Sequence, residues 1–297
     1  MSNDSVELRS RAIALAARGG IAKAWEMGPQ SQPIDLILSH ANGFNGRTYR
    51  TIVAPLAERY RILLLDQRGH GRCELPADTA APRLSWDDLA ADLGDILEVL
   101  DLKDVVLAGH SMGGTVSTMT AAAVPGRVRG LVLLDPVILP PDMVAEGRAG
   151  RLTESPLVIG AKKRRSTFPS FEAVIQTYTG RGAFGSWTPA MLADYVADGF
   201  RPTPEGEVEL TCTPAWEASG FMAQGHDPWV AFDNLRMPIH ILKAETGSTC
   251  RIEGLEDRVL AGGEVEIETI AGTSHFLPME RPDLVQAALV AMLERRN

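Results

Sequence analysis

Residues 105–115 read Val-Val-Leu-Ala-Gly-His-Ser-Met-Gly-Gly-Thr. An apolar run typical of a buried strand leads into Gly-x-Ser-x-Gly, and a helical pattern follows at once. Such a strand–turn–helix has a sharp turn that lifts the serine hydroxyl above the sheet edge, and only small residues such as Gly109 and Gly113 fit beside it. We therefore predict that Ser111 is a nucleophile, with the next helix directing its N-terminus to the place where negative charge would develop.

The same glycines suggest a rival interpretation, a phosphate-binding loop, because Gly109 and Gly114 have the spacing of that motif. A phosphate loop needs Lys and then Ser or Thr directly after its second glycine. Thr115 and Val116 stand at those two places, so the sequence excludes it.

Around this stretch, short β-type runs alternate with amphipathic helical patterns, which indicates an α/β sheet built from crossover units. Several runs are continuously apolar, as expected for central parallel strands that are covered on both faces. The expected strands are residues 11–17, 21–25, 34–39, 61–66, 105–108, 128–134, 239–243 and 265–270. The expected helices are residues 48–58, 86–100, 115–123 and 284–294.

Residues 137–235 break this alternation and hold most of the aromatic residues of the chain. An inserted helical lid that presents aromatic walls to a pocket would have this composition. We therefore predict a core of residues 1–136 and 236–297, with a lid of residues 137–235. The alternative is that these aromatic residues only form the core of a small subdomain.

A serine hydroxyl is a poor nucleophile until a base removes its proton. His275 lies between the last expected strand and the last expected helix, at the sheet edge where Ser111 is also expected. We predict that His275 is this base. His110 shares the turn of Ser111 and cannot easily face it, and the other histidines are interpreted as structural.

Composition limits the partners and the compartment. The chain has 297 residues and a formal net charge of −9, which disfavours nucleic acids and anionic bilayers as partners. No apolar stretch is long enough to span a bilayer, and the run at residues 12–17 is too short for a secretory signal. Three scattered cysteines are too few for a disulfide framework or a cysteine-rich metal site. We expect a cytoplasmic protein without a metal or a membrane partner, and a homo-oligomer stays open.

Four landmarks together make the chain resemble the α/β-hydrolase fold superfamily over nearly its whole length. They are His-Ala-Asn-Gly-Phe at 40–44, Asp-Gln-Arg-Gly-His-Gly at 66–71, the elbow at Ser111, and Gly-Thr-Ser-His-Phe at 272–276. The resemblance implies an eight-stranded, mostly parallel sheet flanked by helices, with an inserted helical lid. It also implies an oxyanion hole made by the backbone N–H groups of Met112 and Phe44. We interpret His40, Asp66 and Arg68 as structural residues that hold the loops near the site.

The acid of the triad departs from the pattern of this superfamily, which usually places an aspartate after the seventh strand. Residues 242–249, which begin at the end of the expected strand 239–243, contain Glu245 but no aspartate. Asp135 ends the expected strand 128–134, an arrangement similar to that of pancreatic-type lipases and zearalenone-lactonase-like enzymes. We favour Asp135 as the acid, and Glu245 stays the alternative.

The resemblance and the residues together predict a cofactor-free serine hydrolase that cleaves a small to medium, apolar carboxylic ester or lactone. Ser111 would attack the carbonyl group, His275 would transfer the proton, and Asp135 would orient the imidazole. Two alternatives stay open: hydrolysis of an amide or carbon–carbon bond by the same residues, and a ligand receptor on a hydrolase scaffold. Dehalogenases and epoxide hydrolases of this fold use an aspartate at the elbow, so Ser111 counts against them.

Overall fold

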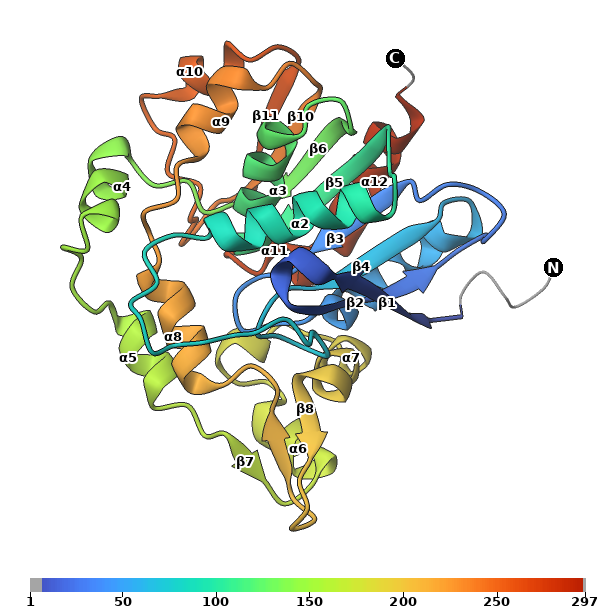
Figure 1. Ribbon diagram of the computed structural model, residues 1–297, viewed down its shortest axis with the longest axis vertical. Helices are drawn as coiled ribbons and strands as arrows, with labels where there is room; N and C mark the ends of the chain where they lie inside the picture. Colours follow the sequence, from blue (N-terminus) through green and yellow to red (C-terminus); the bar gives the residue numbers. More distant parts are fainter. Residues whose placement is uncertain (1–6, 296–297) are drawn as a thin grey trace.

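An eight-stranded sheet forms the centre of the protein, for which a computed structural model describes residues 7–295 (Figure 1). The strands lie in the order β1-β2-β4-β3-β5-β6-β10-β11. From β4 to β11 all neighbours are parallel, whereas β2 is antiparallel to both β1 and β4. The strands are β1 (Arg9–Leu15), β2 (Gly20–Met27), β3 (Leu36–Ser39), β4 (Ile62–Asp66), β5 (Val105–His110), β6 (Val128–Leu134), β10 (Ile239–Ala244) and β11 (Val265–Ile270). The mostly parallel sheet that the sequence predicts is confirmed.

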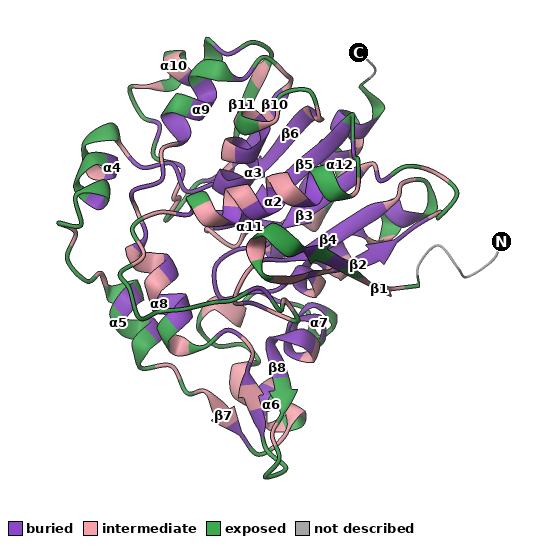
Figure 2. Ribbon diagram, in the orientation of Figure 1, coloured by how far each residue is buried: buried purple, intermediate pink, exposed green. Residues whose placement is uncertain are grey.

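Both faces of the central strands are covered, which explains their continuously apolar sequences. Successive side chains alternate between two core clusters: Leu38 and Ala108 belong to one, and Ile37 and Leu107 to the other. The first cluster includes residues of helices α1 (Arg50–Val53) and α12 (Pro282–Glu294). The second includes residues of α2 (Asp87–Val99), α3 (Met112–Ala123) and α9 (Pro228–Asn234). Figure 2 shows the central strands buried along their length.

Two expected elements differ in detail. The first strand begins and ends two residues earlier than predicted, and a 3-10 turn, η2 (Ala16–Arg18), follows it. Gly19 closes that turn with a φ of 73°, a conformation that glycine adopts without strain. The expected helix at 48–58 is divided into η3 (Gly46–Tyr49), α1 and η4 (Ala54–Glu58), in which Pro55 has no N–H to continue an α-helix.

The predicted lid range, residues 137–235, is not purely helical. It contains a small antiparallel sheet of order β7-β9-β8, which local periodicity could not reveal because its strands have only two or three residues. α9 also lies in this range, yet its Trp229 and Phe232 pack in the second core cluster, beside the helices of the large sheet. The elements of the range before α9 are α4 (Pro141–Arg148), α5 (Pro156–Lys162), β7 (Thr167–Phe168), α6 (Phe171–Tyr178), η5 (Gly182–Phe184), α7 (Pro189–Gly199), β8 (Phe200–Pro202), β9 (Val208–Leu210) and α8 (Pro214–Met222).

Residues 156–222, from α5 to α8, are called the cap segment below. Figure 1 shows this segment gathered at one end of the molecule, where its helix α7 contacts α1. Among the described residues, the remaining helices are two short ones, α10 (Glu256–Leu260) and α11 (Leu277–Glu280), which precede α12 in the chain.

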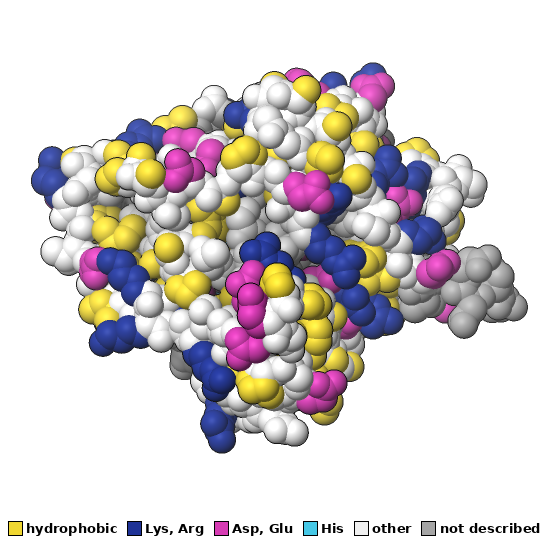
Figure 3. All heavy atoms as spheres, turned by 60° about the horizontal axis from the view of Figure 1, so that its bottom comes forward, with side chains coloured by type: hydrophobic (Ala, Val, Ile, Leu, Met, Phe, Trp, Pro, Cys, Tyr) yellow, Lys and Arg dark blue, Asp and Glu magenta, His cyan; other side chains and the backbone are white. Residues whose placement is uncertain are grey.

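The surface at the cap end carries charges of both signs. In Figure 3, which turns this end toward the viewer, basic and acidic side chains interleave with apolar ones. Of the helices within residues 7–295, none is long and apolar enough to cross a membrane. Over the same residues, no three His, Cys, Asp or Glu side chains are grouped so that they could hold a metal ion.

Candidate active site

Ser111 lies on a sharp turn between β5 and α3, as the sequence predicts. Its backbone has a φ of 55° and a ψ of −121°, which is strained for a residue other than glycine. A Cβ atom added to Gly109 would lie 2.2 Å from the Gly113 carbonyl, and one added to Gly113 would lie 2.1 Å from the Ser39 carbonyl oxygen. Both glycines are therefore required for the close approach of the turn to its neighbours.

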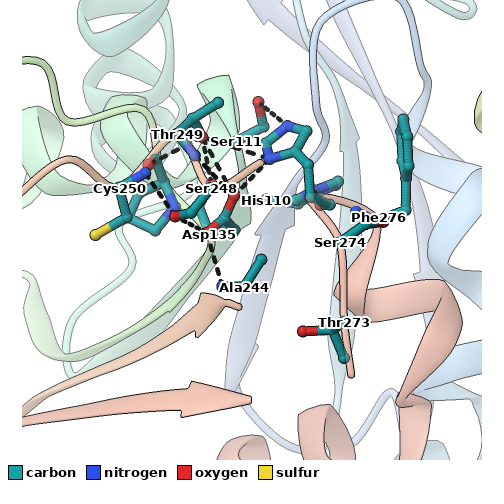
Figure 4. A network of polar contacts seen from close by, with 12 residues as sticks. His110, Ser111, Asp135, Ala244, Ser248, Thr249, Cys250, Thr273, Ser274 and Phe276 are labelled. Carbon is teal, nitrogen blue, oxygen red and sulfur yellow. Dashed lines mark hydrogen bonds and ion pairs between the residues drawn. The ribbon is translucent and has the colours of Figure 1, made fainter. Parts of the chain in front are cut away.

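Three side chains form a continuous hydrogen-bonded chain at the carboxyl ends of three parallel strands (Figure 4). His275 Nε2 lies 3.0 Å from Ser111 Oγ, and His275 Nδ1 lies 2.6 Å from Asp135 Oδ2. The carboxylate can only accept, so Nδ1 carries the proton and Nε2 is free to accept the serine proton. The structure thus brings together the three residues that the sequence singled out, from positions that follow β5, β6 and β11.

The environment of Asp135 keeps its carboxyl group ionised. Complete burial of the side chain favours the neutral acid and raises the pKa. Hydrogen bonds from His275, from the Ser248 hydroxyl and from the Ala244 N–H favour the carboxylate and outweigh burial, so the pKa of Asp135 lies below its ordinary value. Asp135 is therefore a charged acceptor for the imidazole at neutral pH.

Glu245, the other candidate acid, has a different partner. Its Oε2 accepts the Gly272 N–H at 2.9 Å on the exposed side of the loop. Asp135, and not Glu245, is the carboxylate within hydrogen-bond distance of His275.

The two N–H groups that the sequence predicts for the oxyanion hole, those of Met112 and Phe44, differ in whether they already have a hydrogen-bond partner. Met112 is the first residue of α3, and the N–H groups of the first helical turn have no partner within the helix. Its N–H is therefore available beside Ser111. The Phe44 N–H donates to the Ala41 carbonyl at 3.1 Å, so it closes a turn within its own loop in this structure. Phe44 can serve an oxyanion only by sharing or exchanging that bond, and its role stays a prediction.

Two buried histidines hold the loop at residues 40–44 against the turn at residues 66–71. His40 Nε2 accepts the Gln67 N–H at 3.0 Å, and His70 Nε2 accepts the Gly43 N–H at 3.0 Å. Burial lowers the pKa of His40 to about 4 and the pKa of His70 well below its ordinary value, so both rings stay neutral. They can act as acceptors for this reason.

His110 has a structural role that the sequence did not reveal. Its Nε2 donates to the His275 carbonyl at 2.8 Å, and its Nδ1 accepts from the Tyr49 hydroxyl at 2.7 Å. The Tyr49 oxygen in turn accepts the Ala41 N–H at 3.2 Å. Burial lowers the pKa of His110 to about 3, which keeps this ring neutral as well. In the sequence, only the position of His110 next to Ser111 points to a role near the site, and no motif indicates one for Tyr49.

Aromatic side chains of the cap segment contact the loop beside the serine. The Phe44 ring centroid lies 5.2 Å from that of Trp187 and 5.7 Å from that of Tyr195, both in the cap segment. It also lies 6.4 Å from that of Phe276, the residue after His275. Phe44, Trp187 and Tyr195 belong to the first core cluster and Phe276 packs against it, so apolar packing extends from the cap segment to the residue after His275.

Curated proteins similar to this chain include enzymes and enzyme subunits of several kinds. The magnesium-chelatase 30 kDa subunit of Rhodobacter capsulatus is 32% identical over 167 residues, which cover 52% of this chain and 57% of that protein. The chain thus covers less than two thirds of that relative. The 2-(acetamidomethylene)succinate hydrolase of Mesorhizobium japonicum is 22% identical over 267 residues, 87% of each chain.

Solved structures and a family model agree on the fold. The crystal structure of E-2-(acetamidomethylene)succinate hydrolase covers 97% of this chain and 100% of its own, with a TM-score of 0.76 and 19% sequence identity. The sequence model of the alpha/beta hydrolase family matches residues 36–288. That match includes β3 to β11 and all three hydrogen-bonded side chains, and the chain belongs to the alpha/beta hydrolase family.

Proposed function

We propose that this protein is a cofactor-free serine hydrolase that cleaves a carboxylic ester or a lactone through an acyl-serine intermediate. The observation that carries the proposal is the chain Asp135–His275–Ser111, with distances of 2.6 Å and 3.0 Å. A base within hydrogen-bond reach of a serine, itself oriented by a buried carboxylate, is the arrangement that activates a hydroxyl.

In the proposed reaction, Ser111 Oγ attacks the carbonyl carbon while His275 Nε2 accepts the serine proton. The carbonyl electron pair moves onto oxygen, which the Met112 N–H stabilises, with Phe44 as the second donor after its bond to Ala41 is exchanged. When the tetrahedral intermediate collapses, the carbon–oxygen bond of the leaving group breaks and His275 donates its proton to the alkoxide. His275 then takes a proton from a water molecule whose oxygen attacks the acyl carbon. As this second tetrahedral intermediate collapses, the bond from carbon to Ser111 Oγ breaks, His275 returns the proton to Oγ, and the carboxylic acid is released.

We also propose that the cap segment is the lid of this site and selects small to medium apolar substrates. Support comes from the contacts of Trp187 and Tyr195 with Phe44, the predicted second oxyanion donor. An apolar pocket with a few polar groups is the usual form of a small-molecule site.

A fluorophosphonate probe tests the proposed function, because it reacts with a serine only when a base and an oxyanion hole act on it. We expect wild-type protein to be labelled and Ser111→Ala to remain unlabelled. Ser186→Ala is a matched control, since Ser186 is an exposed serine of the cap segment and should leave labelling intact. Absence of labelling in folded wild-type protein would contradict the proposal, and binding of an apolar ligand would then favour a receptor.

Hydrolysis of an amide is the second candidate. The observation that favours it is the likeness, over 87% of both chains, to a hydrolase whose named substrate contains an acetamido group. The same three residues could cleave either bond, so the fold alone does not decide. Measuring kcat/KM for an ester and an amide of the same acyl group separates the two: turnover of the amide alone would replace the ester proposal.

A further inference from the structure

The loop after β10 surrounds the carboxylate of Asp135 (Figure 4). The Ala244 N–H and the Ser248 hydroxyl donate to Oδ1, at 2.9 Å and 2.6 Å. The Thr249 N–H donates to Oδ2 at 3.1 Å, beside the bond from His275 at 2.6 Å. The Thr249 hydroxyl lies a further 3.5 Å from Oδ2. Apart from His275, all these donors come from the end of β10 and the loop that follows it.

The arrangement of these donors decides which oxygen faces the imidazole. Rotation of a carboxyl group about its last side-chain bond is broad and roughly two-fold, so the torsion alone does not select an orientation. The Ser248 hydroxyl and the Ala244 N–H occupy Oδ1 from one side, and Oδ2 is left for His275. Removal of the Ser248 donor would leave Oδ1 with one partner and would free the carboxylate to turn.

The backbone of Asp135 also needs support, because its φ of 42° is strained for a residue other than glycine. The Thr249 hydroxyl lies 3.0 Å from the Asp135 carbonyl oxygen and 3.2 Å from that of Pro136, so its proton is held by this turn. A parallel bridge between Ile138 and Cys250 extends the same contact along the chain. The loop therefore fastens the main chain of Asp135 as well as its side chain.

We propose that Ser248 and Thr249 are positioning residues of the active site, whose hydroxyl groups hold Asp135 in the orientation that His275 requires. The inference rests on the proposed function, in which Asp135 orients His275. Neither hydroxyl has a hydrogen bond to Ser111 Oγ or to His275 Nε2 within the described residues, although the Thr249 hydroxyl lies 3.4 Å from His275 Nδ1. Outer partners of this kind set the geometry and the basicity of the group that they hold.

Kinetics of four variants on p-nitrophenyl acetate test the proposal. Ser248→Ala and Thr249→Val remove one hydroxyl each, and Ser248→Thr and Thr249→Ser restore it. We expect each removal to lower kcat about tenfold, the equivalent of one hydrogen bond, with KM unchanged. The acid limb of the pH profile should move to lower pH in Ser248→Ala, because a carboxylate that can turn away from the imidazole stabilises the imidazolium less. The restoring variants should return both quantities toward wild type.

Glu253→Gln is the matched control, since Glu253 follows the same loop but pairs with Lys243 and does not reach Asp135. It should leave kcat and the pH profile unchanged. A purely structural role for Ser248 and Thr249 would lower the melting temperature of their variants without moving the pH profile, and that result would overturn the proposal.

A second readout does not depend on turnover. A proton shared between His275 Nδ1 and a carboxylate gives a far-downfield ¹H NMR signal, which His275→Asn assigns by its loss. We expect the signal to move upfield or broaden in Ser248→Ala and to return in Ser248→Thr. An unchanged signal in Ser248→Ala would overturn the positioning role. Failure of wild-type protein to hydrolyse esters or react with fluorophosphonate would instead overturn the proposed function, while the NMR comparison still decides this inference.

Discussion

Ser111 and Asp135 both have positive φ angles, 55° and 42°, although neither residue is a glycine. Such conformations cost on the order of 1–3 kcal/mol each and persist where the surroundings hold them. Both residues directly follow a strand of the sheet, so the strain turns their side chains out of the strand direction and toward His275. At the residue scale, the site thus depends on two unfavourable backbone conformations.

Asp135→Asn tests the role of the buried carboxylate. An amide cannot stabilise the imidazolium, and it places an NH₂ group against donors from Ser248 or Thr249. We expect kcat to fall by about 10⁴-fold on an ester substrate, with a cooperative unfolding transition retained in urea. Glu245→Gln is the control and should stay near wild type, since Glu245 bonds only Gly272 here. The reverse pattern would assign the acid to Glu245.

Asp66 makes stability depend on pH. Burial raises the pKa of Asp66 to about 7, although the N–H groups of Arg72 and Gly46 donate to its oxygens. The folded protein therefore holds this proton more tightly than the unfolded chain, in which the pKa of the carboxyl group is 3.8. The contribution of Asp66 to stability is greatest below that pH and falls as the pH rises from 3.8 to about 7. We expect the free energy of unfolding of Asp66→Asn to increase relative to that of wild type over the same pH range. One pH unit changes this difference by about 1.4 kcal/mol.

Urea unfolding of both proteins at about pH 5 and about pH 8 measures this difference. Glu205→Gln, at an exposed position of the cap segment, serves as the control and should show no such trend. A constant difference between Asp66→Asn and wild type across the two pH values would show that Asp66 is ionised at both.

At the scale of elements, one hydrogen-bonded path joins three loops that follow different strands. It runs from the Ala41 N–H to the Tyr49 hydroxyl, on to His110 Nδ1, and from His110 Nε2 to the His275 carbonyl. The loops after β3, β5 and β11 are thereby tied to one another behind the reacting groups. This buried path adds to the bonds that hold each loop separately, such as that from the Gly43 N–H to His70.

Tyr49→Phe tests this connection. The variant leaves the Ala41 N–H and His110 Nδ1 without partners in a buried place, at a cost of about 1–3 kcal/mol. We expect lower stability in urea together with a lower rate of fluorophosphonate labelling. Tyr60→Phe makes the same chemical change before β4, at the opposite end of that strand from the site, and should leave labelling unchanged. Unaltered labelling in Tyr49→Phe would mean that the loops keep their positions without the path.

At the scale of the whole molecule, α7 fastens the cap segment to the core. Buried Asp198 accepts hydrogen bonds from the indole N–H of Trp25 and from Arg72, whose guanidinium also lies over the Trp25 ring. Four residues away on the same helix, Asp194 accepts from Thr51 at 2.8 Å and from Arg50 at 3.2 Å. In each of these hydrogen bonds and ion pairs the donor belongs to the core and the acceptor to the cap segment, so they attach the cap segment to the core.

Asp198→Ala should loosen this attachment. The buried Trp25 N–H loses its acceptor, and we expect a loss of about 2 kcal/mol in the free energy of unfolding. Limited proteolysis should then cut within residues 156–222 faster than in wild type. Glu209→Gln breaks a solvent-exposed pair with Arg201 in the same cap segment and should change neither quantity measurably. Equal proteolysis of Asp198→Ala and wild type would show that other contacts hold the cap segment.

Much of the fold and the main residues of the site could be predicted from the sequence because their signals are local. Apolar runs such as residues 62–65 identify strands from a few neighbouring positions. The turn at Ser111 is marked by Gly109 and Gly113, because a side chain at either position would collide with neighbouring backbone atoms. His275 and Asp135 each follow an expected strand, and the carboxyl ends of parallel strands share one edge of a sheet, so the sequence predicts that they lie near Ser111.

What the sequence could not decide depends on contacts between distant residues. Asp135 and His275 are 140 positions apart, and it is the folded loops, in which Glu245 accepts the Gly272 N–H instead, that make Asp135 the partner of the imidazole. Hydroxyl groups such as that of Ser248 are common on any surface, so only the folded loop shows that this one meets the carboxylate. Hydrophobic periodicity and the steric limits of turns involve only a few neighbouring residues, so the sequence alone predicts the strands, helices and turns that depend on them. The groups that hydrogen-bond to Asp135 and His275, such as the Ser248 hydroxyl, depend on how whole helices, strands and loops pack together. Only the tertiary structure shows them.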